Sequence, residues 1–562
     1  MVNPTGSRPP DQASWRAVGA DSRRAVRLSE LMAGWPGAEH RGRDVGVVDC
    51  THDSRQVRPG WLFCALSGAH FDGHDYAETA VRAGARALLV QHFLDLDVPQ
   101  LRVPNVRWAI GPVAAVLHGR PADGLSIAGL TGTNGKTTVS YLLHSAFVAA
   151  GWPAARLGTV ETRIGRHRWT SPLTTLEATE LQRAFVRMRR EGVRAVAMEV
   201  SSHALDQHRV GGVTFDVAVF TNLEAEHLDY HGTMEQYYYA KSLLFTPERC
   251  RQALVCVDDE WGVRLAHQSR VPTTTFGRTD RAQVRITDTT SDLNGTRIRL
   301  EDAAGSVELS APVVGACHAT NVAAAYLAAR ALGVPAEAAA TGIATCEPIP
   351  GRSELVDVGQ PFLVVVDYAH TPGALRAQIE TARRLVERGG QVHLVVGCRG
   401  GRDRHKRPDA GRAAMAADTV ILTSDSPGDE DRQGIVSQML AGMLERPDRE
   451  VVVELDRAAA IGSAVAVARP GDVVLILGRG HETTQSVAGR AVPFDDREQA
   501  RAVLTARGWA DGGSTGTPVR RKAERLRLGV VKCHPAHGAT GNVPSGVLGF
   551  ADEGPPYGAL SP

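Results

Sequence analysis

The chain has 562 residues, a formal net charge of +1, 43% hydrophobic residues and 22% charged residues. These proportions are those of an ordinary soluble globular protein, and the length predicts three or four domains rather than one core. The near-neutral charge gives no sign of binding to nucleic acid or to an anionic membrane surface.

The eight cysteines are scattered without a C-x-x-C pair, which argues against a structural zinc site and a disulfide framework. No apolar stretch approaches the length of a membrane span, and the start MVNPTGSRPPDQ lacks the layout of a secretory signal. We therefore expect a cytoplasmic enzyme, and a monomer, that acts without membrane or nucleic acid.

The N-terminal part of the chain has two different characters. Residues 1–25 are polar and contain prolines, so we expect a flexible segment. Residues 26–118 alternate apolar runs with helical patterns and predict a first domain. Within it, the spacing of apolar residues predicts a helix at 77–85 and a buried strand at 87–90.

The middle and C-terminal parts show short apolar runs that alternate with helical stretches, a pattern typical of a parallel α/β sheet. The pattern restarts after residue 351, which indicates a domain boundary nearby. The expected strands are 125–130, 195–200, 217–221, 363–367, 392–396, 420–423 and 473–477, and the expected helices include 137–150 and 319–332. Residues 511–562 are rich in glycine, proline and serine, and we expect a disordered tail.

The strand at 125–130 leads directly into a glycine loop that carries a lysine and two threonines. Such a loop at the start of a helix presents backbone N–H groups to phosphate, and its lysine and hydroxyl groups serve the outer phosphates and Mg²⁺. Leu130 stands where the general G-x-x-x-x-G-K-[ST] pattern has its first glycine, so a glycine turn without a ligand is the alternative. The residues predicted to bind ATP are Gly132, Thr133, Asn134, Gly135, Lys136, Thr137 and Thr138.

Two further residues occupy positions suited to ligand binding. Glu199 ends one apolar run and His227 follows the next, and ligands of parallel sheets bind at the carboxyl ends of the strands. Each residue taken alone would be read as a solvated surface side chain. Beside a phosphate loop, the pair favours a magnesium site.

The segment TGTNGKTT resembles the signature of the Mur ligase superfamily, which also includes folylpolyglutamate synthases. The segments MEVSSH, QHRV, TNLEAEHLDYH and YAK resemble blocks of the MurE type, which adds the third residue of the peptidoglycan stem peptide. The resemblance implies that Thr137, Glu199 and His227 bind Mg²⁺. It also implies that CO₂ carbamylates Lys241, which turns an ammonium into an anionic oxygen ligand for a hard cation.

The same resemblance implies a reaction and its substrates. The γ-phosphoryl group of ATP activates a carboxylate as an acyl phosphate, which an amine then attacks. The DSR…DG block near residue 54 resembles a uridine-nucleotide domain, so the implied acceptor is UDP-MurNAc-L-Ala-D-Glu. The implied acceptor-binding residues are Ser54, His70, Thr174, Thr175, Ser201, Gln207 and Arg209, with Arg209 as a catalytic carboxylate clamp.

Further blocks, GRSE, DYAHTP, GCRGGRDRHKRP and GRGHE, resemble the C-terminal part of the family. They imply that Asn321, Arg352 and Asp367 contact ATP, and that Arg402, Asp425, Gly478 and Glu482 hold the free amino acid. Without the resemblance, the basic glycine-rich run at 397–408 would suggest RNA binding, but no aromatic residues interleave it.

The implied fold is α/β with the three-domain Mur ligase architecture. It comprises a uridine-nucleotide-binding domain (26–118), a central P-loop ATPase domain (119–348) and a C-terminal Rossmann-like domain (349–510). The family's DNPR motif reads Asp425-Ser426-Pro427-Gly428 here, and loss of its arginine would cost about 1.5–3 kcal/mol of affinity for a distal carboxylate. The added amino acid, whether diaminopimelate, lysine or another, therefore stays open.

Two alternatives to this interpretation remain. Departures from the family pattern at Leu173, Glu226, His318, Ser426 and Gly428 leave open a paralogue that ligates a specialised-metabolite peptide. A folylpolyglutamate synthase would leave the N-terminal domain unexplained. A catalytically dead relative would be expected to lose one of the residues that carry the chemistry, and Lys136, Glu199, His227 and Lys241 are all present.

Overall fold

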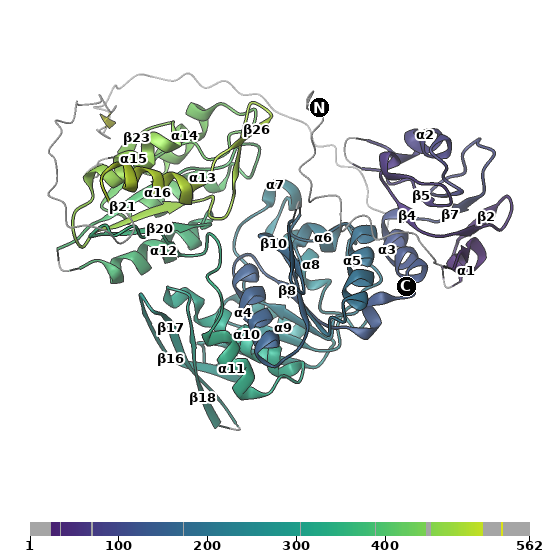
Figure 1. Ribbon diagram of the computed structural model, residues 1–562, viewed down its shortest axis with the longest axis horizontal. Coiled ribbons are helices and arrows are strands. Elements are labelled where there is room, and N and C mark those ends of the chain that lie inside the picture. The colour runs from purple at the N-terminus through teal and green to yellow at the C-terminus, as the bar shows by residue number, and fades with distance from the viewer. Residues whose placement is uncertain are drawn as a thin grey trace, which may run out of the picture.

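The structure is a computed structural model that describes residues 24–509, apart from 34, 69–70, 172, 304, 388 and 445–450, together with the strand at 530–531. The chain folds into three lobes in a row, with the N-terminal and C-terminal lobes on either side of a central one (Figure 1). The predictions for the N-terminal segment and for the tail lie outside the described residues, except at residues 24–25 and 530–531.

The N-terminal lobe is built on a five-stranded sheet that is parallel except at one edge. The strand order is β2 (Glu39–Arg41), β7 (Gln100–Arg102), β6 (Ala87–Val90), β5 (Leu62–Cys64) and β4 (Cys50–Thr51), with β2 antiparallel to β7. A two-stranded ribbon and the helices complete it: β1 (Val26–Arg27), β3 (Gly46–Val47), α1 (Leu28–Met32), α2 (Ala77–Arg82), α3 (Val106–Leu117) and short 3₁₀ turns at Ser54–Gln56 and Gly73–Tyr76.

The central lobe contains one sheet of eleven strands. It is parallel from β9 to β16 and antiparallel at both edges. The order is β11 (His167–Thr170), β10 (Glu161–Ile164), β9 (Ala154–Leu157), β12 (Ala195–Glu199), β8 (Ser126–Thr131), β13 (Val217–Phe220), β14 (Ala253–Cys256), β15 (Thr273–Gly277), β16 (Val284–Asp292), β17 (Gly295–Asp302) and β18 (Gly305–Ala311).

Helices cover both faces of this sheet, because alternate residues of its middle strand point to opposite sides. Ala128 and Leu130 of β8 pack in one apolar cluster with α4 and α10, and Ile127 packs in another with α5. The helices are α4 (Lys136–Ala149), α5 (Ala178–Arg190), α6 (Ser202–Asp206), α7 (Leu228–His231), α8 (Met234–Ser242), α9 (Glu260–Gln268), α10 (Ala319–Ala331) and α11 (Ala336–Ala344), with 3₁₀ turns at Pro121–Gly124 and Ala316–His318.

The C-terminal lobe is a second α/β layer structure. Its sheet has the order β19 (Glu354–Leu355), β20 (Leu363–Asp367), β24 (Val473–Leu477), β21 (Val392–Val396), β22 (Thr419–Leu422), β23 (Val451–Val453) and β27 (Val530–Val531), and is parallel from β20 to β23. Its other elements are α12 (Pro372–Leu385), α13 (Lys406–Ala414), α14 (Arg432–Ala441), α15 (Arg457–Val467), α16 (Asp496–Ala506) and the hairpin β25 (Thr484–Val487) to β26 (Arg490–Pro493).

Local sequence signals explain where several helices start. Thr371 accepts a hydrogen bond from Ala374 N ahead of α12, whose first residue is Pro372. Asp456 likewise accepts bonds from Ala458 N and Ala459 N at the start of α15. These caps satisfy backbone donors that have no partner inside the helix.

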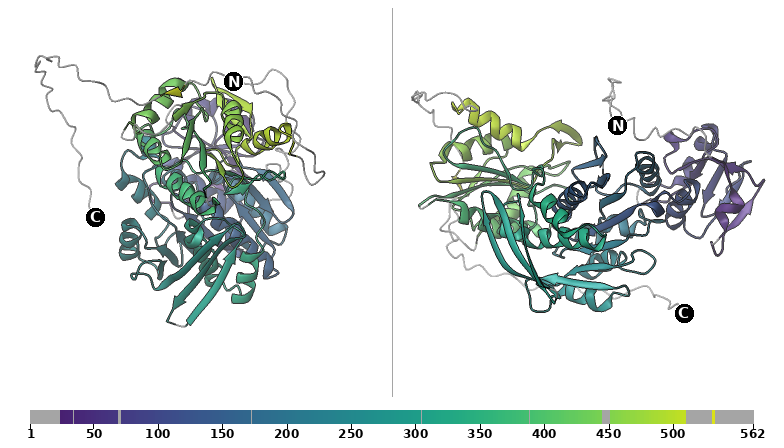
Figure 2. Two further views of the ribbon diagram at one scale, coloured as in Figure 1. Left: turned by 90° about the vertical axis from the view of Figure 1, so that its left-hand side faces the viewer. Right: turned by 60° about the horizontal axis from the view of Figure 1, so that its bottom comes forward.

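The α/β fold class is confirmed, and each expected strand and helix is present. The helix expected at 77–85 ends earlier, at Arg82, and the other bounds agree within one residue. The antiparallel strands β10–β11 and β17–β18 were not predicted; Figure 2 shows β16–β18 extending away from the rest of the central lobe. Among the described helices, none combines the length and apolar character that crossing a membrane requires.

The two joints between lobes are built differently. Arg183 of α5 donates to both carboxylate oxygens of Asp49 in the N-terminal lobe, at 3.1 and 3.2 Å, and both side chains are 3% exposed. His118 Nε2 lies 3.1 Å from the same carboxylate. The joint between the central and C-terminal lobes instead crosses a large cavity, and the groups that bridge it belong to the candidate site.

Candidate active site

The phosphate loop lies at the centre of the site because β8 is flanked by β12 and β13. Gly132 and Gly135 have φ of 142° and 92°, which favour glycine. A Cβ on Gly135 would lie 2.2 Å from Asn321 Oδ1, and a Cβ on Gly132 would lie 2.0 Å from Thr221 Oγ1. Both positions therefore require glycine for reasons of backbone conformation and space.

Lys136 begins α4 and folds back over the loop. Its Nζ donates to Gly132 O at 2.7 Å and to Thr133 O at 2.9 Å. Burial lowers the pKa of this ammonium. With the N-terminus of α4 beside it, the loop presents positive charge and N–H donors to an anion, as phosphate binding requires.

Glu199, the last residue of β12, is held by two threonines. Thr137 Oγ1 donates to Glu199 Oε2 at 3.1 Å, and Thr159 donates to the carboxylate through Oγ1 at 2.8 Å and through its backbone N at 3.1 Å. The carboxylate thus lies against the first turn of α4. Thr159 was not predicted, and no motif around it gave a signal.

Lys241 and His227 approach the same place from α8 and from the N-cap of α7. Lys241 Nζ donates to Gly132 O at 2.9 Å, and the side chain is 1% exposed. Burial, followed by the positive charge of Lys136, holds the pKa of Lys241 well below its usual range. Burial also lowers the pKa of His227 to about 3, so its imidazole is neutral at pH 7.

These residues fit a magnesium ion that shares its ligands with phosphate. Among the described residues, no three His, Cys, Asp or Glu side chains gather closely enough to hold a metal by themselves. One carboxylate (Glu199), one hydroxyl (Thr137) and one neutral imidazole (His227) line the same cavity. Mg²⁺ is typically held by one or two carboxylates together with substrate phosphates, so this donor set suits it.

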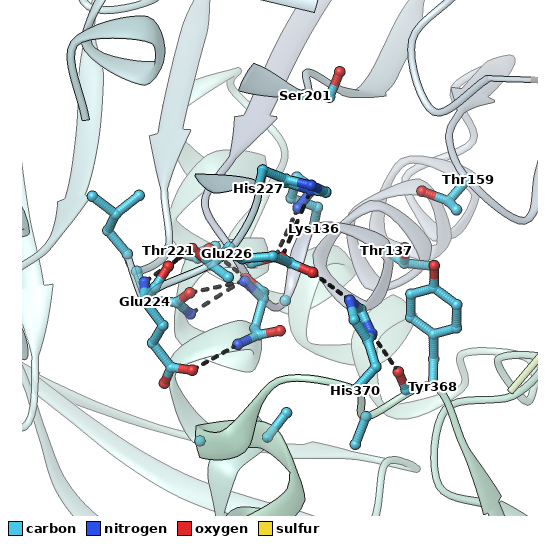
Figure 3. A pocket seen from close by; sticks show the side chains of 18 of the residues that line it. Lys136, Thr137, Thr159, Ser201, Thr221, Glu224, Glu226, His227, Tyr368 and His370 are labelled. Carbon is cyan, nitrogen blue, oxygen red and sulfur yellow. Dashed lines mark hydrogen bonds and ion pairs between the residues drawn. The ribbon is translucent and has the colours of Figure 1, made fainter. Parts of the chain in front are cut away.

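A cavity of about 750 Å³ extends from the phosphate loop to the C-terminal lobe. In Figure 3, Lys136, Thr137 and His227 from the central lobe face Tyr368 and His370 from the C-terminal lobe. The predicted site residues on its wall are Thr133, Asn134, Gly135, Lys136, Thr137, Thr138, Thr174, Glu199, Ser201, Arg209, His227, Lys241, Asn321, Arg352, Asp367, Arg402, Asp425 and Gly478.

The C-terminal lobe contributes charged groups directly to the phosphate loop. Arg352 Nη2 donates to Thr137 Oγ1 at 3.1 Å, and its guanidinium stacks 4.5 Å from the centre of the Tyr368 ring. Asp367 accepts hydrogen bonds from Ser353 N and Ala369 N, both at 2.7 Å. Burial raises the pKa of Asp367. Both residues line the cavity, and their contact with ATP stays a prediction.

Glu226 bridges the two lobes. Its carboxylate is hydrogen-bonded to His370 Nε2 of the C-terminal lobe (Figure 3). It also lies 3.8 Å from Nζ of Lys406 in the same lobe. Burial alone would raise the pKa of Glu226, but the contact with His370, together with His227 and Lys406, outweighs burial and holds this pKa well below the usual range. This departure from the family pattern therefore has a structural role in the joint.

The predicted acceptor-binding residues are only partly together. Arg209 donates to Gln207 Oε1 at 2.6 Å and pairs with Glu177 at 2.9 Å. Thr175, Gln207 and Ser54 are absent from the described cavity wall, although Thr175 Oγ1 accepts a hydrogen bond from Ser201 N at 3.0 Å. Ser54 lies in the N-terminal lobe, and His70 lies outside the described residues.

At the far end of the cavity, Glu482 lies one layer behind the wall. Its carboxylate accepts hydrogen bonds from Arg399 Nη1 at 3.0 Å and Nη2 at 3.3 Å. The described wall includes Arg399 but lacks Glu482. Arg399 and His370 stand inside blocks recognised in the sequence, but neither was predicted as a site residue.

Comparisons with known proteins identify the family of this chain. Three family models match the chain: "Mur ligase family, catalytic domain" at residues 47–114, "Mur ligase middle domain" at 130–329 and "Mur ligase, glutamate ligase domain" at 351–480. A Streptomyces avermitilis protein named UDP-N-acetylmuramoyl-L-alanyl-D-glutamate--2,6-diaminopimelate ligase is 45% identical over 85% of this chain and 96% of its own length. A Geobacillus kaustophilus protein of the same name is 41% identical over 86% of this chain and 100% of its own.

Solved structures show the same relationship. The structure of a UDP-N-acetylmuramoyl-L-alanyl-D-glutamate--2,6-diaminopimelate ligase is 31% identical, has a TM-score of 0.62, and covers 86% of this chain and 99% of its own. The MurF ligase from Thermotoga maritima in complex with ADP shares the fold at 20% identity, with a TM-score of 0.57 over 82% of this chain and 97% of its own. With relatives above 40% identity across most of its length, the chain belongs to the Mur ligase family.

Proposed function

We propose that this chain is an ATP-dependent ligase that joins an amino acid to the D-glutamate carboxylate of UDP-MurNAc-L-Ala-D-Glu in peptidoglycan precursor synthesis. The observation that carries the proposal is the convergence of the phosphate loop, Glu199 and Lys241 on one wall of a cavity shared by two lobes. The names of the relatives at 41–45% identity supply the acceptor and point to diaminopimelate as the amino acid.

The first step activates the acceptor. A carboxylate oxygen of the acceptor attacks the γ-phosphorus of ATP, and the bond to the β-phosphate oxygen breaks to release ADP. Lys136 and Arg352 lie where they balance the charge of the transferred phosphoryl group, because both contact the loop around Thr137. Arg209 orients the acceptor carboxylate from the same cavity wall.

The second step forms the amide. The amine of the incoming amino acid attacks the acyl carbon, inorganic phosphate leaves with the bonding electron pair, and the nitrogen loses a proton. Binding between lobes brings amine and acyl phosphate together and excludes water, which would otherwise hydrolyse the intermediate.

Magnesium fits this site. Thr137, Glu199, His227 and a carbamylated Lys241 would hold the ion, which would supply positive charge to the phosphate oxygens. The amines of Lys136 and Lys241 both donate to Gly132 O, so the two lysines lie side by side in a buried place. Among the described residues, no carboxylate lies within ion-pairing distance of Lys241. Reaction of its neutral amine with CO₂ would form a carbamate and release a proton, which would place a negative charge beside Lys136.

The test offers the protein ATP, Mg²⁺ and UDP-MurNAc-L-Ala-D-Glu with a panel of amino acids, and follows phosphate release and the mass of the product. We expect release only when nucleotide and amino acid are both present, and none after chelation of magnesium. Release with other peptide carboxylates but none with this nucleotide would instead support the specialised-metabolite paralogue, which the relatives' names do not favour.

Carbamylation of Lys241 is tested in a separate experiment. Protein equilibrated with ¹³C-bicarbonate is expected to show one carbamate carbon resonance that disappears in Lys241→Ala. Lys406→Ala is the matched control, because this lysine lines the same cavity but lies near Glu226 rather than the loop, and its loss should leave the resonance in place. A resonance that survives Lys241→Ala contradicts the carbamate assignment without affecting the ligase proposal.

A further inference from the structure

The part of the cavity formed by the C-terminal lobe carries a charged cluster, of which Arg402, Asp425 and Glu482 are predicted to hold the amino acid and Arg399 has no assigned role. It is formed by the loop after β21, the loop after β22 and the residues after β24. Arg399, Arg402 and Asp425 stand on the cavity wall, and Glu482 and Arg479 lie behind it.

Arg399 is both fixed in position and available to a ligand. Its two terminal nitrogens are paired with the two oxygens of Glu482 at 3.0 and 3.3 Å, and its side chain remains 40% exposed. A guanidinium has five N–H donors, and this pairing engages two of them. The remaining donors belong to a residue of the cavity wall, so the pair fixes the guanidinium without using up its capacity.

The backbone conformation explains why the arginine of this wall stands at position 399 rather than at position 428. Gly400 N donates to Ser426 O at 3.0 Å, and a Cβ on Gly400 would lie 1.9 Å from Pro427 O, so the two loops are in close contact. Gly428 has φ of 61° and bonds through both its N and its O to the β25–β26 hairpin. A side chain at position 428 would be strained, whereas Arg399 projects from the loop packed against it.

The arginines at this end of the cavity differ in their exposure. Arg399 pairs with Glu482 and Arg479 lies near Asp425 and Glu482, whereas Arg402 is an exposed residue of the wall and its neighbour Asp403 is buried. Arg479 is 0% exposed and donates to Ser426 Oγ, Thr484 O and Phe494 O, so its hydrogen bonds stay inside the protein. The two arginines of this cluster that a ligand can reach are therefore Arg399 and Arg402.

We propose that Arg399 selects the incoming amino acid by binding a second carboxylate at its distal end. This inference rests on the proposed ligase function and names the residue that decides between two otherwise matched amines. A ligand carboxylate would take the free N–H donors of Arg399 and balance the charge of Arg402. A distal ammonium without a carboxylate would instead face two guanidinium groups.

The experiment compares diaminopimelate with L-lysine, which differs from it by the distal carboxylate alone. Phosphate release is measured with ATP, Mg²⁺ and UDP-MurNAc-L-Ala-D-Glu for the wild type, Arg399→Ala, Arg399→Lys and Arg404→Ala. Arg404 is the matched control, since it belongs to the same loop, pairs with Glu430 and is absent from the described cavity wall.

In Arg399→Ala, kcat/KM for diaminopimelate should fall about 10- to 100-fold, mainly through KM, as expected for a lost charge-assisted pair. The value for lysine should stay within about threefold or rise, because Glu482 is then free to accept an ammonium. In Arg399→Lys, kcat/KM for diaminopimelate should lie between the values of the wild type and Arg399→Ala. In Arg404→Ala, it should match the wild-type value.

Two results overturn the inference alone: an unchanged ratio of diaminopimelate to lysine in Arg399→Ala, or equal losses for both amino acids in the two Arg399 variants. Absence of phosphate release by the wild type with either amino acid overturns the proposed function, and the inference falls with it. The wild-type measurement thus separates the two failures.

Discussion

The contact of Glu226 with His370 makes a quantitative prediction about how the lobes come together on ATP. Glu226 is 5% exposed and belongs to the central lobe, while His370 and Lys406 belong to the C-terminal lobe. The phosphate loop and Arg352 also lie on opposite sides of the joint, so ATP bound to both, as we predict, would span the two lobes. Loss of the Glu226 contact should therefore weaken ATP binding.

The magnitude follows from burial and from the kind of contact. A hydrogen bond that involves a charged group contributes roughly 1.5–3 kcal/mol, and desolvation of the carboxylate offsets part of this gain. Since His370 is 28% exposed, we expect the lower part of the range for coupled pairs. A coupling of about 1–2 kcal/mol corresponds to a factor of about 5–30 in ATP affinity.

The assay is a double-mutant cycle of Glu226→Ala and His370→Ala, with affinity for a non-hydrolysable ATP analogue measured by calorimetry. Glu226→Asp withdraws the carboxylate by about 1.5 Å and should give an intermediate loss. Glu235→Gln is the control, because that exposed residue pairs with Arg264 away from the joint. A coupling energy below about 0.3 kcal/mol would refute the reasoning.

Two further predictions concern the other joint and the loop. Arg183→Met leaves the buried Asp49 without its guanidinium partner and should cost about 3–5 kcal/mol in urea unfolding; a loss below 1 kcal/mol would contradict this. Hydrogen bonding from His118 and the charge of Arg183 outweigh burial and hold the pKa of Asp49 below its usual value, so its stabilisation is present above pH about 4 and is lost on acidification. The decrease in the free energy of unfolding on acidification, measured by urea unfolding, should be smaller in Arg183→Met than in the wild type. Gly135→Ala forces a Cβ to 2.2 Å from Asn321 Oδ1 at a φ of 92°, and KM for ATP should rise at least 10-fold while that for the amino acid changes little.

Much of the fold could be predicted because its signals are local. The apolar runs at β6, β20, β21 and β24 matched the observed strands, since strands buried on both faces are continuously apolar. The antiparallel strands β10–β11 and β17–β18 were missed. Their exposure alternates, as in β17 with its pattern of buried and exposed residues, and they lack such apolar runs.

The phosphate-loop part of the site was also predictable. Glu199 and His227 were identified from their places after apolar runs, and the order β12-β8-β13 brings them to the loop. Thr159 could not be found in the same way, because it lies after a strand that is next to β12 only in space. Arg399 was recognisable as part of a basic loop, but its partner Glu482 is 83 residues away.

The sequence by itself determined the chemistry: a glycine loop with Lys136, the strand-end residues and the family they indicate. These depend on residue type and short spacing, which a sequence contains. The tertiary structure alone decided which charges meet. It placed Glu226 across the joint on His370, Glu482 behind Arg399 and Gly428 in a left-handed conformation. Such pairings depend on how separately folded lobes and loops pack, so they follow from three-dimensional contact rather than from any local pattern.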